Sequence, residues 1–148
     1  KKKYKLFKPI VDNRYDINKV VSHNMNSIQS ITISSSEDIY KHIENEKIIA
    51  IDEAQFLDKN LYIVCKKLVH NGIDLIIAGL DMDYKGNPFG VMPKLLAISE
   101  NVTKMHAICF DCGDKANYTF RINNNNTQQV LIGSKDNYKA LCKNCFFK

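Results

Sequence analysis

The sequence predicts an α/β protein in which a parallel sheet flanked by helices is followed by a small, β-rich metal-binding unit. In the first part of the chain, short β-branched runs alternate with segments of helical periodicity, and this alternation implies right-handed crossovers and a parallel sheet. From residue 109 onward the segments become short, and cysteines occur in two C-x-x-C pairs. We therefore expect an α/β domain at residues 1–107 and a zinc-binding domain at residues 108–148.

Individual elements follow from the spacing of apolar residues. The predicted strands are 4–8, 31–33, 48–51, 75–78 and 102–108. The predicted helices are 34–44, 59–71 and 93–99. Ser34 with Glu37 fits a capping box for the first helix, and Asp58 with Gly72 fits the two ends of the second. The polar stretch 12–30 is predicted to be a loop.

Composition and charge narrow the class of protein. The chain has 148 residues, of which 45% are hydrophobic, enough for one domain with a real core and a small appendage. The chain has a net charge of +5. Apart from the three lysines at residues 1–3, its basic residues are scattered and form no dense block, so no nucleic-acid partner is expected. No apolar stretch approaches the length of a membrane span and no signal-peptide pattern opens the chain, so we expect a cytoplasmic protein without a membrane partner.

The two C-x-x-C pairs are the most specific chemical signal in the residues themselves. Their members are Cys109, Cys112, Cys142 and Cys145. Four thiolates suit tetrahedral Zn²⁺ and leave no position for substrate or water, so the zinc would be structural. A redox role for either pair is the alternative. Residues 118–122 and 129–132 flank four asparagines, a pattern typical of a β-hairpin that would bring the two pairs together.

Two adjacent carboxylates, Asp52 and Glu53, directly follow the apolar run 48–51. The carboxyl ends of strands are where open α/β sheets bind ligands. One carboxylate there can hold a metal ion through water while the other accepts a proton, as on the Walker B strand of a phosphate-transferring enzyme. The alternative is that the acidic residues only cap the helix that follows.

Other side chains are expected near the same edge of the sheet. Apolar and aromatic residues that could wall a flat ligand, or simply pack a loop onto the core, are Phe56, Leu80, Tyr84 and Phe89. The chain has only two arginines, Arg14 and Arg121, and either could clamp a phosphate or lie on the surface. The fifth cysteine, Cys65, lies on the apolar face of a predicted helix and is expected in the core.

Several motifs occur together in the order found in type II thymidine kinases, the cytosolic-type enzymes with a zinc-bearing lasso. Besides the two C-x-x-C pairs they are Phe7-Lys8-Pro9, Asp12-Asn13-Arg14-Tyr15, Ser22-His23, Asp52-Glu53-Ala54-Gln55-Phe56, Gly79-Leu80-Asp81-Met82-Asp83-Tyr84, Pro88-Phe89-Gly90 and Val102-Thr103-Lys104. The chain resembles this family from about Lys5 to Phe147. The resemblance implies a P-loop NTPase (RecA-like) sheet, a C-terminal zinc-binding lasso domain and a homotetramer.

The resemblance also implies an activity and a role for each matching residue. The activity is transfer of the γ-phosphoryl group of ATP to the 5′-hydroxyl of thymidine, or of deoxyuridine, in nucleotide salvage. Glu53 resembles the general base and Asp52 the acid that holds Mg²⁺. The residues that would contact the metal and phosphates are Asp12, Arg14 and Arg121. Those that would line the thymine pocket are Phe56, Leu80, Tyr84 and Phe89, together with Gly133, Ser134 and Tyr138 of the lasso.

The chain departs from the family in one respect. Type II thymidine kinases carry a phosphate-binding loop before the strand that matches residues 4–8, and this sequence has no G-x-x-x-x-G-K-[ST] pattern. We expect that a segment of about 25–35 residues, the size of one βα unit, supplies this loop. The rival interpretation is a non-catalytic zinc-ribbon module that binds nucleic acid, attached to a remnant nucleotide-binding domain.

Overall fold

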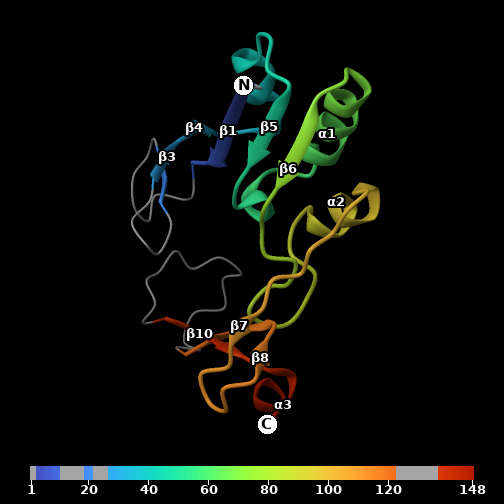
Figure 1. Cartoon of the computed structure of the whole chain (residues 1–148). Helices are drawn as coiled ribbons and strands as arrows, with labels where there is room; N and C mark the ends of the chain where they lie inside the picture. The colour runs from blue at the N-terminus through green and yellow to red at the C-terminus, as the bar shows by residue number, and fades with distance from the viewer. Residues whose placement is uncertain (1–2, 11–18, 22–26, 123–136) are drawn as a thin grey trace.

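The computed structural model describes residues 3–10, 19–21, 27–122 and 137–148 (Figure 1). Figure 1 shows the parallel sheet and the C-terminal strands in two regions of the molecule, joined by the loop after β6 and by the extended chain after α2. Each region has its own cluster of buried apolar residues.

A four-stranded parallel sheet organises the larger region. Its order is β4-β1-β5-β6, and its strands are β1 (Tyr4–Pro9), β4 (Ile31–Ile33), β5 (Ile48–Ile51) and β6 (Asp74–Ile77). Phe7 of β1 lies opposite Ile31 on one side and Ile51 on the other. The predicted parallel sheet is therefore confirmed, and the strands at 31–33 and 48–51 have the predicted bounds.

Helix α1 (Leu61–His70) packs its apolar face into the core as its spacing predicts. The residues that it buries are Leu61, Val64, Cys65 and Leu68. Burial raises the pKa of the Cys65 thiol to about 12, because the thiolate would lose its hydration. Cys65 is therefore a core residue and not a reactive thiol.

Four shorter helical segments occur in the described part of the chain. They are η1 (Ser36–His42), η2 (Ala54–Phe56), α2 (Met92–Ile98) and α3 (Lys143–Phe146). α2 places Pro93 in its first turn, where the missing N–H costs nothing. Within the described ranges, no helix combines the length and the apolar character that crossing a bilayer requires.

The predicted caps of the first two helices are each displaced. η1 begins one residue later than expected, so the capping pair is Ser35 with Asp38, whose carboxylate accepts the Ser35 N–H at 2.9 Å, and not Ser34 with Glu37. Asn60, and not Asp58, precedes α1. The Asp58 carboxylate instead accepts the N–H of buried Ser36 at 2.6 Å and its hydroxyl at 2.9 Å, which ties the start of η1 to the start of α1.

The strand predicted at 102–108 is wrong for most of its length. Only β7 (Ala107–Ile108) forms, and it pairs antiparallel with β8 (Lys115–Ala116), outside the parallel sheet. The chain from Val102 to Met105 crosses between the two regions with both of these side chains exposed. The apolar run misled the prediction because a strand also needs a neighbour, and among the described residues no strand pairs with the outer edge of β6.

Antiparallel pairs make up the rest of the described structure. β9 (Tyr118–Arg121) pairs with β10 (Tyr138–Leu141), whereas the hairpin partner predicted at 129–132 lies outside the described residues. β2 (Lys19–Val21) pairs with β3 (Ser27–Gln29) inside the stretch predicted to be a loop. Polar residues dominate that stretch and predict a loop, but a short two-stranded ribbon does not require an apolar face.

The link from Asp58 to Ser36 predicts a measurable contribution to stability. Asp58→Ala leaves the buried Ser36 N–H without its acceptor and is expected to lower the free energy of unfolding by about 1–3 kcal/mol. Urea denaturation measures this loss. Lys59→Ala, at the exposed neighbouring position, is the control, and equal stability of the two variants would show that the link contributes nothing.

The same link predicts a pH dependence. Burial acts to raise the pKa of the Asp58 carboxyl, but hydrogen bonds from Ser36 and Asn60 outweigh it and lower the pKa from 3.8. A lowered pKa means that the stabilisation is complete above about pH 4 and is lost as the pH falls further. The stability difference between the wild type and Asp58→Ala should therefore shrink in acid, and a constant difference would contradict the assignment.

Candidate active site and metal centre

Asp52 and Glu53 lie at the carboxyl end of β5, on a turn held by both neighbouring strands. The Asp52 N–H bonds to the Phe7 carbonyl of β1 at 2.9 Å. The Ala54 N–H bonds to the Ala78 carbonyl, just past β6, at 3.0 Å. Both carboxylates are half-buried. The backbone that carries them is therefore fixed from both sides of the sheet.

Glu53 has an unusual backbone conformation. Its φ of 50° and ψ of 40° are left-handed, and among the described residues it is the only non-glycine with positive φ. An ordinary residue in this region costs about 1–2 kcal/mol. Such strain persists only where the surroundings enforce it, and it concentrates at functional sites.

The carboxylate of Glu53 does not cap the helix that follows. Glu53 precedes η2, yet within the described residues its side chain makes no capping hydrogen bond. Its Oε2 instead accepts a hydrogen bond from Nε2 of Gln55 at 2.5 Å. Asp52 Oδ1 accepts the Glu53 N–H at 3.0 Å. The geometry therefore disfavours the alternative that this pair serves only as a cap.

Three of the four predicted wall residues lie near the acidic turn. Phe56 of η2 and Phe89 meet edge to face, with ring centroids 5.6 Å apart. The Leu80 N–H donates to Oε1 of Gln55 at 3.0 Å, which places the start of the loop 79–90 beside Glu53. The fourth wall residue, Tyr84, lies in the middle of the same loop and contacts Arg121 of the C-terminal region.

The loop 79–90 is internally braced, and sequence reasoning missed the residue responsible. Asp83 is 4% exposed, and its Oδ1 accepts the N–H groups of Lys85 at 2.9 Å and Asn87 at 3.0 Å. The Asp83 N–H in turn bonds to the Asn87 carbonyl at 2.8 Å. Tyr84 is therefore presented by a tight turn. The Asp-x-x-x-Asn spacing inside a loop rich in turn formers was the available signal.

Arg121 is buried between two tyrosines. It is 1% exposed, its guanidinium carbon lies 3.7 Å from the ring centroid of Tyr84, and its Nη2 donates to the Tyr138 hydroxyl at 2.8 Å. A planar guanidinium can stack on one ring and hydrogen-bond to another group in its own plane. Arg121 thus joins the loop 79–90 to β9 and β10.

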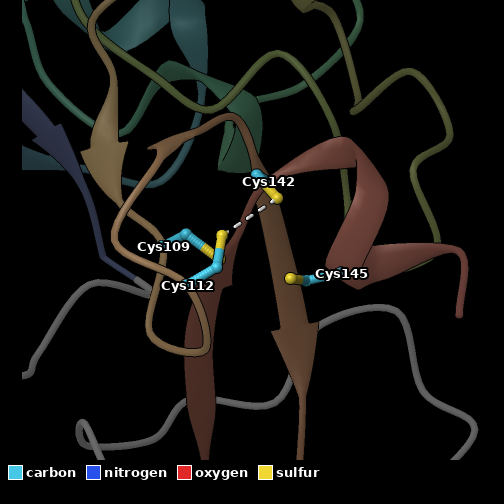
Figure 2. Close-up of side chains that lie close together, drawn as sticks. All are labelled: Cys109, Cys112, Cys142 and Cys145. Atoms are coloured by element: carbon cyan, nitrogen blue, oxygen red, sulfur yellow. Dashed lines mark hydrogen bonds between the residues drawn. The ribbon is translucent and has the colours of Figure 1, made fainter.

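The four cysteines of the C-x-x-C pairs come together in the C-terminal region (Figure 2). Their sulfurs all lie within 4.8 Å of one another, and Sγ of Cys112 and Cys142 are 3.6 Å apart. Tetrahedral Zn²⁺ with bonds of about 2.3 Å places its sulfurs about 3.8 Å apart. The donor set and its spacing therefore fit structural zinc, and all four cysteines are free thiols, not disulfides.

The thiols affect one another's ionisation. Burial acts to raise the pKa of the Cys109 thiol, but backbone hydrogen bonds from Cys142 and Cys112 outweigh it and lower the pKa to about 6. The pKa of Cys145 is raised to about 12, first by its hydrogen bond with Cys142 and then by burial. The charge of Cys109 adds a smaller increase to the pKa of Cys145, and a divalent cation bound here would allow all four thiols to ionise together.

Comparison with known proteins identifies the family. The family model described as thymidine kinase matches residues 1–146. The thymidine kinase of Bacteroides thetaiotaomicron is 47% identical over 148 residues, which is 100% of this chain and 74% of that protein. Those of Bacteroides fragilis and Porphyromonas gingivalis are 47% and 44% identical over 146 and 143 residues, covering 99% and 97% of this chain and 73% and 70% of their own lengths. The chain belongs to the thymidine kinase family.

Some of the site residues inferred from the thymidine kinase resemblance lie outside the described residues. They are Asp12, Arg14, Gly133 and Ser134. Their roles therefore stay predictions. Of the remainder, the structure gathers Asp52, Glu53, Phe56, Leu80 and Phe89 around one turn, and it gathers Tyr84, Arg121 and Tyr138 in a second group.

Gln55 is a further residue of this thymidine kinase site that sequence reasoning left without a role. It is 3% exposed and contacts both Glu53 and the loop 79–90. No periodicity marks it, because a single polar residue between Ala54 and Phe56 fits an exposed position equally well. Its two hydrogen bonds, to Glu53 and from Leu80, become visible only in the folded structure.

The metal centre predicts one tightly bound zinc per chain. Elemental analysis of the purified protein should find it, and Cys142→Ser should lose it, because three ligands from this unit hold zinc far more weakly than four. Cys65→Ala, at the cysteine outside the cluster, is the control and should retain the metal. A protein that contains no zinc and forms disulfides between the pairs would contradict this assignment.

Proposed function

We propose that this chain phosphorylates thymidine at the expense of ATP, giving thymidine monophosphate for nucleotide salvage, and that it also accepts deoxyuridine. The observation that carries the proposal is the carboxylate of Glu53. A strained turn at the carboxyl end of β5 presents it, half-buried and held by a neutral amide. Membership of the thymidine kinase family supports the choice of substrate.

In the proposed reaction the 5′-oxygen of thymidine attacks the γ-phosphorus of ATP. The new oxygen–phosphorus bond forms as the bond to the β,γ-bridging oxygen breaks, and ADP leaves. The proton of the 5′-hydroxyl passes to the Glu53 carboxylate. Phosphoryl transfer depends chiefly on positioning and on charge neutralisation, so a fixed proton acceptor is what this turn contributes.

Asp52 is proposed to hold the Mg²⁺ that accompanies ATP. A half-buried carboxylate at a strand end is the oxygen donor that this ion prefers, and the ion would neutralise charge on the phosphates. Asp12 and Arg14 are proposed to contact the same phosphates. Arg121 was expected there too, but its burial between Tyr84 and Tyr138 favours a role in building the pocket.

The thymine ring of the nucleoside is proposed to bind between the two groups of wall residues. Phe56, Leu80 and Phe89 form one wall, and Tyr84 and Tyr138 the other. Backbone groups of Gly133 and Ser134 would read the edge of the pyrimidine. Such a pocket excludes water, which limits loss of ATP to hydrolysis.

The remaining properties are proposed from the family resemblance. We propose a cytoplasmic homotetramer whose chain has an α/β domain at residues 1–107 and a zinc-binding lasso domain at 108–148. The two separate clusters of buried apolar residues support that division. A zinc ribbon that binds nucleic acid without catalysis is not favoured, because the family model matches both regions.

A kinase assay tests the proposal directly. The complete protein should transfer labelled phosphate from ATP to thymidine and to deoxyuridine. Deoxycytidine, whose 4-amino group reverses the hydrogen-bonding pattern of the thymine edge, should be a poor acceptor. Failure to phosphorylate any nucleoside would overturn the proposed function.

Glu53→Gln should separate binding from chemistry. The amide keeps the shape of the side chain but cannot accept the 5′-hydroxyl proton, so turnover should fall by at least about 100-fold. Thymidine affinity, measured by calorimetry, should stay within a few-fold of the wild type. Glu44→Gln, at an exposed position, is the control. Near-normal turnover of Glu53→Gln would remove this residue from the role of base.

Arg121→Lys should distinguish a pocket residue from a phosphate clamp. Lysine keeps the charge but cannot both stack on Tyr84 and bond to Tyr138, so the KM for thymidine should rise about tenfold while the KM for ATP changes little. Lys139→Met, on the neighbouring strand, is the control. A raised KM for ATP with an unchanged KM for thymidine would instead support the phosphate role.

A further inference from the structure

We propose that Gln55 is a positioning residue for phosphoryl transfer: its buried amide aims the Glu53 carboxylate and fixes it to the loop that lines the nucleoside pocket. The inference rests on the proposed function and adds to it, because it assigns the aim of the base to a residue outside the reacting atoms.

Both polar atoms of the Gln55 amide are occupied. Nε2 donates to Glu53 Oε2 at 2.5 Å, and Oε1 accepts the Leu80 N–H at 3.0 Å. The partners also fix which way the amide faces. A carboxylate can only accept and a backbone N–H can only donate, so the reversed amide would lose both bonds.

The loop 79–90 closes tightly around Gln55 at both of its ends. A Cβ on Gly79 would lie 2.7 Å from Oε1 of Gln55, and a Cβ on Gly90 would lie 2.4 Å from its backbone oxygen. Neither position has room for a side chain unless Gln55 moves. The glutamine is 3% exposed within this enclosure, so its rotamer is set by packing as well as by hydrogen bonds.

A neutral donor suits a residue that must accept a proton. Lysine or arginine at this position would neutralise the carboxylate, whereas an amide orients it and leaves it negative. The hydrogen bond from Gln55 to Oε2 therefore sets the direction in which the carboxylate faces. A catalytic group must be held within about 0.5 Å of its working position, and the strained turn at Glu53 restrains only the backbone.

The same amide makes the position of the Glu53 carboxylate depend on the loop that lines the pocket. The Leu80 N–H is the first link of the loop that carries Tyr84 and Phe89, so a shift of this loop moves Gln55 and, through it, Glu53. Gln55 thus connects the Glu53 carboxylate, the proposed proton acceptor, to the loop whose side chains would position the nucleoside.

Two variants test the proposal on the complete protein. Gln55→Glu keeps an acceptor for the Leu80 N–H but loses the donor to Glu53, and Gln55→Met keeps the volume and loses both bonds. Each should lower kcat for thymidine about 10- to 100-fold. For Gln55→Glu the KM for thymidine should change less than about threefold. Gln29→Glu, the same change at an exposed glutamine of β3, should match the wild type.

The pH profile separates positioning from a merely structural role. In Gln55→Glu the introduced carboxyl can donate to Glu53 only while it is protonated, and at high pH two adjacent negative carboxylates repel each other. Its kcat relative to the wild type should therefore fall as the pH rises and recover as the pH falls. Gln55→Met should show no such recovery. In the Glu53→Gln background neither change should lower kcat further, because no base remains to be aimed. Zinc content and melting temperature establish that each variant is folded.

The outcomes distinguish this inference from the function on which it rests. If the wild type does not phosphorylate thymidine, the proposed function fails. If the wild type is active and both Gln55 variants keep kcat within about twofold, with an unchanged pH profile, the positioning role is overturned. An increase in the KM for thymidine with kcat unchanged would also overturn it, since Gln55 would then support only the loop.

Discussion

The buried amide of Gln55 is the contact on which the arrangement of the site depends. It adds a side-chain link between the acidic end of β5 and the loop 79–90, beyond the backbone hydrogen bonds of the sheet. That loop is braced by Asp83 and places Tyr84 against Arg121. Arg121 in turn bonds to Tyr138 of β10. A continuous series of contacts therefore runs from the proposed base to the C-terminal region.

Sequence reasoning succeeded where one local pattern was sufficient. The spacing on α1 and the apolar run of β5 each predicted their own element, and the two C-x-x-C pairs predicted a cluster that the structure shows. It failed at the strand 102–108, because pairing depends on a partner that the local pattern does not show. It also missed Gln55, because the role of that side chain is set by Leu80 and Glu53 together and not by its neighbours in the sequence.

The placement of Arg121 bears on the role that the resemblance implies for it. Matching positions suggested a phosphate contact, yet the side chain is enclosed by Tyr84 and Tyr138. A buried guanidinium is stable only when its charge and its donors are well accommodated, and aromatic faces with a hydroxyl acceptor accomplish part of this. The phosphate contact of Arg121 stays a prediction.

The four-cysteine cluster belongs to a small core next to Tyr138 and Arg121, two residues of the proposed nucleoside pocket. The buried apolar cluster of the C-terminal region consists of Cys109, Ala116, Leu141 and Cys142, and half of its members are themselves cluster cysteines. A core of this size is small for offsetting the entropy of ordering the chain, and a metal bound by the four cysteines would supply folding free energy. Tyr138 and Cys142 lie at the beginning and just beyond the end of β10, and Arg121 pairs with Tyr138 across the same ribbon. Because one short strand connects the four-cysteine cluster to Tyr138, a zinc ion bound there would hold Tyr138 and Arg121 in place, and these two residues would be the first affected by its loss. The parallel sheet, with its own separate core, would keep Glu53 in place.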